Sequence, residues 1–189
     1  VNSHRLLELM GEQADRAGCD RREGRVVDLR TADGGFVATT DDDRTLTAGN
    51  VVAATKNTVD FMRHIDGVEI LNHGKEFVDT DDRGRTGASG LYAAGRLAAQ
   101  PHQAIIVAGH GATVGVTLIE DSDAEFYHDW VTPEGYFTDR DRECPPGCEE
   151  IDDAEREARE AEALDVLQER FAESHPAEPN QHPSVREDE

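Results

Sequence analysis

The sequence predicts an α/β fold with a C-terminal helical extension, and three patterns predict it. Short alternating runs between residues 25 and 47 are typical of a three-stranded antiparallel meander. A continuous apolar run at residues 50–55 is typical of a strand buried on both faces, as in a parallel sheet, and residues 91–94 give a second buried strand. Helical patterns follow at residues 103–119 and 152–171.

The first part of the chain alternates between helix and strand signals. Apolar residues recur at helical spacing over residues 6–17, with Ser3 as the expected N-cap and Gly18 as the expected stop. Strands are expected at residues 25–30, 36–40 and 44–47, separated by turns at Asp33-Gly34-Gly35 and Asp41-Asp42-Asp43. This order predicts a helix followed by the meander.

The middle of the chain has weaker patterns. We expect a short helical piece at residues 58–65, short strands at 68–71 and 76–79, and a polar loop at 81–87. Pro101 stands near the start of the helix at 103–119, which is apolar almost all round. Such a helix is expected to be buried, and its small residues let a neighbouring backbone come close (Ala108, Gly109, Gly111, Ala112 and Gly115).

Charge excludes several classes of partner. The 189 residues include 41 acidic and 19 basic side chains, a net charge of -22, which argues against binding nucleic acid or an anionic membrane surface. No apolar run approaches the ~20 residues that a membrane span needs, and no early stretch has the pattern of a signal peptide.

Only Lys56 and Lys75 are lysines, and the acidic excess is typical of a cytoplasmic, halophile-type protein from a salt-loaded cell. Three cysteines fit a reducing cytoplasm.

The charge also divides the chain. Residues 1–120 carry 18 acidic and 13 basic side chains, whereas residues 121–189 carry 23 acidic and 6 basic ones. We therefore expect a domain at residues 1–120 and an aromatic-rich irregular extension at 121–151. An acidic amphipathic helix at 152–173 and a disordered tail at 174–189 complete the expected organisation.

The stretch Leu91-Tyr92-Ala93-Ala94-Gly95, followed by a short loop and by Gln103-Ala104 at the start of a Gly/Ala-rich helix, carries a family resemblance. It resembles the C-terminal flavin segment of thioredoxin-reductase-like, FAD-dependent pyridine-nucleotide–disulfide oxidoreductases. The order of helix, meander and a strand ending in Ala54-Thr55 is similar as well, so the resemblance covers about residues 4–120. It implies a partial FAD/NAD(P)-binding, Rossmann-like domain.

The resemblance also implies which residues meet FAD. Gln103 and Ala104 match the helix start that faces the flavin N1–C2=O edge, where the helix dipole favours negative charge. Gly95 and Arg96 match the pair beside the ribityl chain and pyrophosphate. Val26 matches a backbone contact with adenine, and Thr55 lies at a strand end near the cofactor. No residue is singled out as catalytic or as a metal ligand.

The chain departs from the family pattern at several points. No G-x-G-x-x-G motif follows a strand, so the first β-α-β unit is missing from this sequence. The usual Gly-Asp is Gly95-Arg96, and the usual Ala-Thr-Gly is Ala54-Thr55-Lys56, where lysine stiffens the turn. The 33 residues at 56–88 are too few for an inserted NADPH domain, and no Cys-x-x-Cys occurs. NAD(P)H binding by this chain alone is therefore not expected.

Three further groups have a functional and an ordinary interpretation. Cys144-Pro-Pro-Gly-Cys148 is either a redox pair or a turn, and its flanking glutamates favour the turn. His102 either approaches a bound flavin or makes local hydrogen bonds at a helix start. The aspartate clusters at 41–43 and 79–82 lack EF-hand spacing, and zinc would need four ligands that the cysteines and His128 do not supply.

Two functions follow from the sequence. The first is a thioredoxin-reductase-like, FAD-dependent oxidoreductase domain in which electrons pass through bound flavin. The second is a non-catalytic relative that uses the scaffold for protein association, which Lys56 and Arg96 favour. Because the first strand is missing, we expect either that this chain is an N-terminally truncated piece of a longer protein or that a partner completes the sheet. That partner would be a separate N-terminal segment or a second copy of the chain in a homodimer. No redox partner protein is identified.

Overall fold

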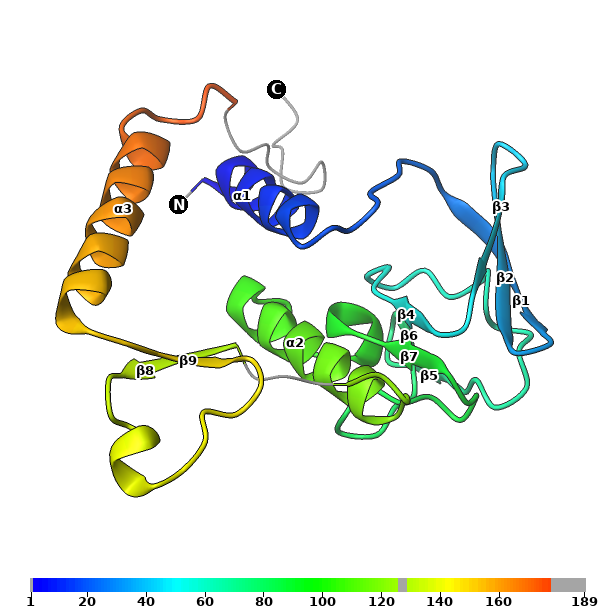
Figure 1. Ribbon diagram of the computed structural model, residues 1–189. Helices are drawn as coiled ribbons and strands as arrows, with labels where there is room; N and C mark the ends of the chain where they lie inside the picture. Colours follow the sequence, from blue (N-terminus) through cyan, green and yellow to red (C-terminus); the bar gives the residue numbers. More distant parts are fainter. Residues whose placement is uncertain (1, 126–128, 178–189) are drawn as a thin grey trace. The chain divides into compact units, whose positions relative to one another are not determined.

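The computed structural model describes residues 2–125 and 129–177, which form two compact units. Within the described residues, one unit is residues 23–125 and the other is residues 2–22 together with 129–177. Figure 1 shows the helices and strands of each unit. This grouping assigns the N-terminal helix to the C-terminal segments, which the boundary predicted at residue 120 did not.

The expected meander forms in residues 23–125. Strands β1 (Val26–Ala32), β2 (Gly35–Thr40) and β3 (Thr45–Ala48) make an antiparallel sheet in the order β1-β2-β3. Gly34, at φ +77°, occupies the tight turn between β1 and β2, where a left-handed conformation favours glycine. The prediction of three short antiparallel strands is confirmed.

A parallel pair lies beside the meander. Strands β4 (Val51–Ala53) and β7 (Leu91–Ala93) pair in parallel, with Val51 opposite Leu91. All of β7 is buried, but Val52 of β4 is 42% exposed, so the prediction that this run is buried on both faces is wrong for β4. The cause is that β4 pairs with β7 alone among the described strands.

The segment between these strands contains one confirmed and one wrong prediction. Strands β5 (Ile70–Asn72) and β6 (Glu76–Val78) form the expected antiparallel pair. Within residues 58–65, where a helical piece was predicted, residues 60–64 form turns and not a helix. The carbonyl of Phe61 accepts a 2.8 Å hydrogen bond from the backbone N–H of Leu29 in β1, and this cross-link replaces a helical ladder.

Helix α2 (Ala104–Glu120) follows the 3₁₀ turn η1 (Gly95–Ala98). The helix was predicted at residues 103–119, but its predicted complete burial is wrong, because only Val114 and Thr117 are buried and Ile105 is 83% exposed. One face packs on β7 and η1. Apart from the helix's own backbone, a Cβ added at Gly109, Gly111 or Gly115 would meet no atom of the described residues within 4 Å. The expected close approach of a neighbouring backbone is therefore not seen at these three glycines within residues 2–125 and 129–177.

The other unit begins with helix α1 (Ser3–Arg16). Its N-cap is Asn2 and not the expected Ser3, because the Asn2 side chain accepts a 2.8 Å hydrogen bond from the His4 N–H. The helix stops at Gly18 as expected, with φ +80°.

Residues 129–151 are more regular than expected. Strands β8 (Trp130–Pro133) and β9 (Cys148–Ile151) pair in parallel, and η2 (Thr138–Arg140) lies between them. The Glu150 carboxylate accepts hydrogen bonds from the backbone N–H groups of Phe137 and Thr138 and from the Thr138 hydroxyl. These bonds order a loop whose residue types give no strand signal. Two aromatic residues of the predicted aromatic-rich extension at 121–151, Phe126 and Tyr127, lie outside the described residues.

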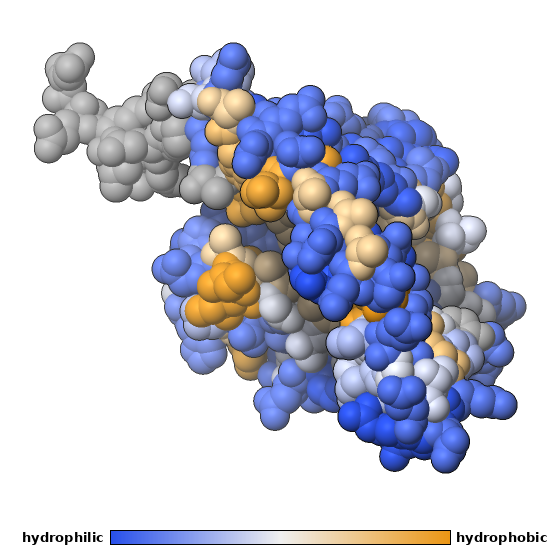
Figure 2. Space-filling view, turned by 60° about the vertical axis from the view of Figure 1, so that its left-hand side comes forward, coloured by the Kyte–Doolittle hydropathy of each residue, from blue (hydrophilic) through white to orange (hydrophobic). Residues whose placement is uncertain are grey.

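Helix α3 (Asp153–Phe171) confirms the last helical pattern, with Asp152 as its N-cap. Its apolar stripe is exposed, at 54% for Leu164 and 55% for Leu167. In the space-filling view, hydrophilic residues dominate the visible face and apolar residues come through in small groups (Figure 2). The end of α3 contacts α1 through an Arg170–Glu12 ion pair of 2.9 Å.

The first residues of the predicted disordered tail make defined contacts. His175 lies 2.8 Å from the Glu8 carboxylate and stacks on His4, with ring centroids 5.3 Å apart. Residues 178–189, which make up most of that tail, lie outside the described part of the chain. None of the described helices combines the length and hydropathy that a membrane span requires.

Candidate functional site

The candidate site is the edge where β4 and β7 end. Because the two strands are parallel, their carboxyl ends meet at one edge of the sheet, which is where open α/β folds bind ligands. The Ala94 N–H donates a 2.8 Å hydrogen bond to the Ala53 carbonyl and holds the two chain segments together there. Thr55 and Gly95 each stand two residues beyond a strand end.

Thr55 closes a turn. Its hydroxyl donates to the Thr58 carbonyl at 2.7 Å, so this side chain is already used within the protein. The next residue, Lys56, has φ +64°, a left-handed conformation that favours glycine. The turn at Lys56 therefore has the backbone geometry that is usual for glycine, and lysine adopts it at a cost in conformational energy.

Gly95 is the most constrained predicted site residue. It is buried at φ +60°, and an added Cβ would come within 3.2 Å of the Val107 Cβ in α2. Its N–H donates to His110 Nδ1 at 3.0 Å. His110 must therefore accept at Nδ1, which assigns its neutral proton to Nε2.

His110 is a residue whose role the sequence reasoning missed. It joins Gly95 to α2, and its Nε2 is buried without a hydrogen-bond partner in the described structure. The available signal was a lone histidine within a helix that is mostly apolar.

Arg96 is held inside the protein. Its guanidinium lies over the Phe77 ring, 4.9 Å from the centroid, and donates to the Gln100 carbonyl at 3.2 Å. The hydrogen bond uses one of the five N–H donors of the guanidinium, and the stacking on Phe77 fixes where the others point. A cofactor contact by the Arg96 side chain therefore stays a prediction.

The start of α2 is open. Gln103 is the N-cap residue with extended backbone, its side chain makes no cap hydrogen bond, and both Gln103 and Ala104 are exposed. The first N–H groups of a helix have no partner within the helix, so they can donate to a ligand. His102, just before the cap, is exposed as well.

Val26 lies apart from the other predicted site residues. It opens β1 opposite Thr40, at a register shift between Val26 and Asp28, and packs against the core of the unit. The structure thus brings Thr55, Gly95 and the packed face of α2 to neighbouring positions. It gives no contact between Val26 and that group.

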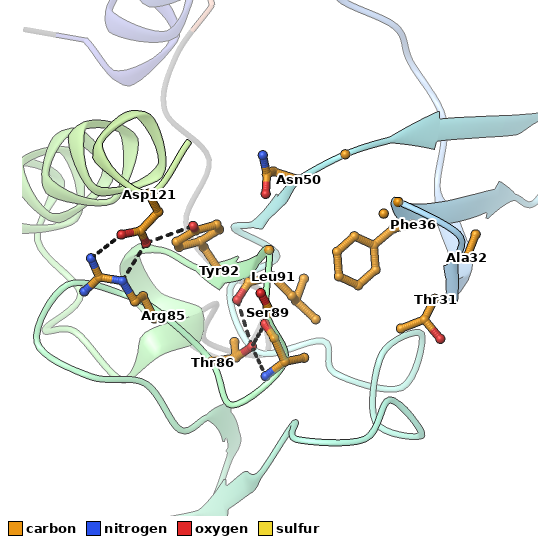
Figure 3. Close-up of a pocket in the computed structure, with 15 residues that line it drawn as sticks. Thr31, Ala32, Phe36, Asn50, Arg85, Thr86, Ser89, Leu91, Tyr92 and Asp121 are labelled. Atoms are coloured by element: carbon orange, nitrogen blue, oxygen red, sulfur yellow. Dashed lines mark hydrogen bonds and ion pairs between the residues drawn. The ribbon is translucent and has the colours of Figure 1, made fainter. Parts of the chain in front are cut away.

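A cavity of about 640 Å³ lies at the opposite, amino ends of β4 and β7 (Figure 3). None of the six predicted site residues lines it. One wall carries an ion pair in which Arg85 donates to both carboxylate oxygens of Asp121, at 2.6 and 2.7 Å, and the Tyr92 hydroxyl donates to the same carboxylate at 3.0 Å.

These contacts shift three pKa values. The hydrogen bond from Arg85 lowers the pKa of Asp121, and the hydrogen bond to Asp121 raises the pKa of Arg85. Burial raises the pKa of Tyr92, and its hydrogen bond to the Asp121 carboxylate adds to the effect. The sequence predicted only a polar loop at 81–87, and the alternation of Asp and Arg at 81–85 was the signal for an ion-pair cluster.

The cysteine pair forms a turn. The Cys148 N–H donates to the Pro145 carbonyl at 3.0 Å, and Cys144 Sγ lies 3.1 Å from the Cys148 carbonyl. Burial raises the pKa of the Cys144 thiol, and the charges of Cys148, Glu150 and Glu149 raise it further, which disfavours a reactive thiolate. In residues 2–125 and 129–177, no group of three or more His, Cys, Asp or Glu side chains is placed to hold a metal ion.

Comparison with known proteins gives little. No protein-family model matches the sequence, and no curated protein matches it significantly. Among solved structures, the chain is similar to LpdA from Mycobacterium tuberculosis, with 19% sequence identity and a TM-score of 0.30, over 66% of this chain and 28% of LpdA. The chain therefore spans well under half the length of LpdA. A likeness this low does not establish a shared fold.

Proposed function

We propose that this chain is the FAD-binding part of a thioredoxin-reductase-like, FAD-dependent oxidoreductase, and that the flavin N1–C2=O edge lies against the start of α2. One observation carries the proposal: an exposed helix start without a side-chain cap follows a parallel strand pair and a constrained glycine turn. Backbone N–H groups there, with the positive end of the helix dipole, favour negative charge on a bound ring.

The residues at this edge fit a flavin in part. Gly95 keeps the backbone free of side-chain bulk where η1 passes under α2, and Gln103 and Ala104 leave the first turn accessible. The Thr55 hydroxyl does not fit as a free ligand, because it already donates to the Thr58 carbonyl. The Arg96 guanidinium donates to the Gln100 carbonyl through one N–H group and has further N–H groups that could donate to a phosphate. FAD would meet Thr55 through its backbone.

The chemistry in this proposal comes from the cofactor, which exchanges electrons through its ring when it is bound. The chain's own residues position that ring and stabilise charge on it. The electron donor and the acceptor would be separate proteins or segments, since this sequence has neither a Cys-x-x-Cys pair nor room for an inserted NADPH domain.

Binding of FAD to the purified full chain tests the proposal. We expect saturable uptake of FAD with the two visible absorption bands of oxidised flavin. Ala104→Glu should weaken binding by about tenfold through charge repulsion and occlusion, although a carboxylate in the first turn stabilises the helix itself. Ala112→Glu, at an exposed position two turns further along α2, is the matched control and should bind normally. A chain that takes up no FAD, or an Ala104→Glu variant that binds like the native chain, would contradict the proposal.

A second candidate function is non-catalytic association through α2, with a second copy of this chain as the partner. The exposed apolar face that carries Ile105, together with the open positions at Gly109 and Gly115, favours it. Sedimentation of the full chain should then show a dimer that Ile105→Glu converts to monomer. A native chain that is monomeric at all concentrations would exclude this candidate.

A further inference from the structure

The cavity at the amino ends of β4 and β7 lies apart from the predicted flavin residues, none of which lines it. We infer that it takes an uncharged, flat ligand with a cyclic amide or amidine edge, the chemistry of nucleobases. The inference is independent of the proposed flavin contact, because the start of α2 follows the carboxyl ends of the same strands.

The size and floor of the cavity suit a small flat molecule. Its volume of about 640 Å³ falls within the roughly 300–1,000 Å³ typical of small-molecule sites. Phe36, Ala88 and Leu91, each less than 9% exposed, form an apolar floor that belongs to the main core. A fixed apolar floor favours a ligand with an apolar face.

The charges of the lining exclude an ionic ligand. Arg85 and Asp121 are the charged side chains among the lining residues, and they neutralise each other through two hydrogen bonds. Neither is free to balance a ligand charge without breaking that pair. The net charge of -22 on the chain adds a general repulsion of anions. The cavity is therefore suited to an uncharged ligand.

Three polar side chains at the rim have unused hydrogen-bonding capacity. The Asn50 amide and the hydroxyls of Ser89 and Thr31 line the cavity, are exposed, and make no side-chain hydrogen bond within the described residues. Figure 3 shows them around Phe36 and Leu91. An asparagine amide presents a donor beside an acceptor, which pairs with a ligand edge of the same kind, as asparagine does with adenine.

The backbone keeps this rim in place. Gly90 has φ +80°, and an added Cβ would lie 3.0 Å from Asn50 Oδ1 and 3.3 Å from the Phe36 ring. The absence of a Cβ at Gly90 therefore lets the Asn50 amide stand next to the apolar floor. A single small ring on the apolar floor could therefore reach both the donor and the acceptor of the Asn50 amide.

Amide chemical shifts of the labelled full chain, titrated separately with adenosine, uridine and riboflavin, test the inference. We expect at least one of the three to shift residues 31–36, 49–50 and 89–92 saturably. Asn50→Asp, which keeps the shape but loses the donor, should weaken this binding by about fivefold, the effect of one lost hydrogen bond. Asn57→Ala, outside the cavity, should leave it unchanged.

Two results would overturn the inference. The first is the absence of saturable shifts at the cavity with all three probes; if riboflavin then shifts only residues 95–107, the flavin proposal is supported and this inference falls. The second is tighter binding of adenosine monophosphate than of adenosine, because the site would then prefer an anion.

Discussion

The two units differ in what holds them together. Among the described residues, the buried apolar side chains lie between Leu29 and Val114, and Phe137 is the one buried apolar side chain outside that range. Residues 2–22 and 129–177 are held mainly by polar contacts, such as Arg159–Glu149, Arg170–Glu12 and the hydrogen bonds to Glu150. Stability from apolar burial is sensitive to the loss of buried side chains, whereas stability from carboxylate contacts also depends on pH and salt.

The largest effect should come from the apolar unit. Leu97 in η1 is fully buried, so Leu97→Ala should lower the free energy of unfolding of residues 23–125 by about 2–5 kcal/mol. Amide hydrogen exchange of the full chain should then accelerate throughout those residues. If exchange accelerated equally in α3, the two units would unfold as one, and the comparison would fail.

Gly95→Ala should have the next largest effect. A side chain at φ +60°, with its Cβ 3.2 Å from Val107, should cost about 1–3 kcal/mol and loosen the packing of η1 against α2. Chemical denaturation of the full chain measures the change. Gly109→Ala, in the open helix interior, is the control and should stabilise the protein slightly. Equal destabilisation by both variants would argue against a special role for Gly95.

Glu150 tests the polar unit. Burial by itself raises the pKa of Glu150, but hydrogen bonds from Phe137, Thr138 and Gly135 lower it below its ordinary value. A depressed pKa means that the stabilising contribution is complete above about pH 5 and is lost as the pH falls through the folded-state pKa. Glu150→Gln should therefore accelerate amide exchange in residues 135–151 at neutral pH and reduce its acid dependence. Unchanged acid dependence in the variant would show that the carboxylate does not hold the loop.

The smallest expected effect is a gain. Lys56 has φ +64°, so Lys56→Gly should raise the stability of residues 23–125 by about 0.5–1 kcal/mol. Thermal unfolding of the full chain should show a small increase in the midpoint. A decrease would mean that the lysine side chain makes a contact that outweighs its backbone strain.

Local sequence patterns predicted where helices and strands form better than they predicted how deeply those elements are buried. The meander, the parallel pair and helices α2 and α3 follow from alternation, apolar runs and 3.6-residue periodicity. The burial of α2 did not follow, because burial depends on neighbouring elements, and only one face of α2 has them. Residues 58–65 and 129–151 are shaped by hydrogen bonds between residues far apart in the sequence, which no local pattern shows. The Leu29 N–H donates to the Phe61 carbonyl, and the Glu150 carboxylate accepts from the Thr138 N–H.

The candidate site was predicted unevenly for the same reason. Gly95 and the α2 start are local features and stand where the pattern indicated. The His110 contact, the Arg96–Phe77 stacking and the cavity wall at Arg85–Asp121 depend on residues brought together by folding.

The most direct test of the flavin proposal is the backbone amide shift of Gln103, Ala104 and Ile105 in the labelled full chain during titration with FAD. We predict that these amides show the largest changes, saturate together with flavin absorbance, and do not respond to adenosine alone. Saturable FAD binding that leaves these amides unmoved, or no binding at all, would contradict a flavin contact at the start of α2.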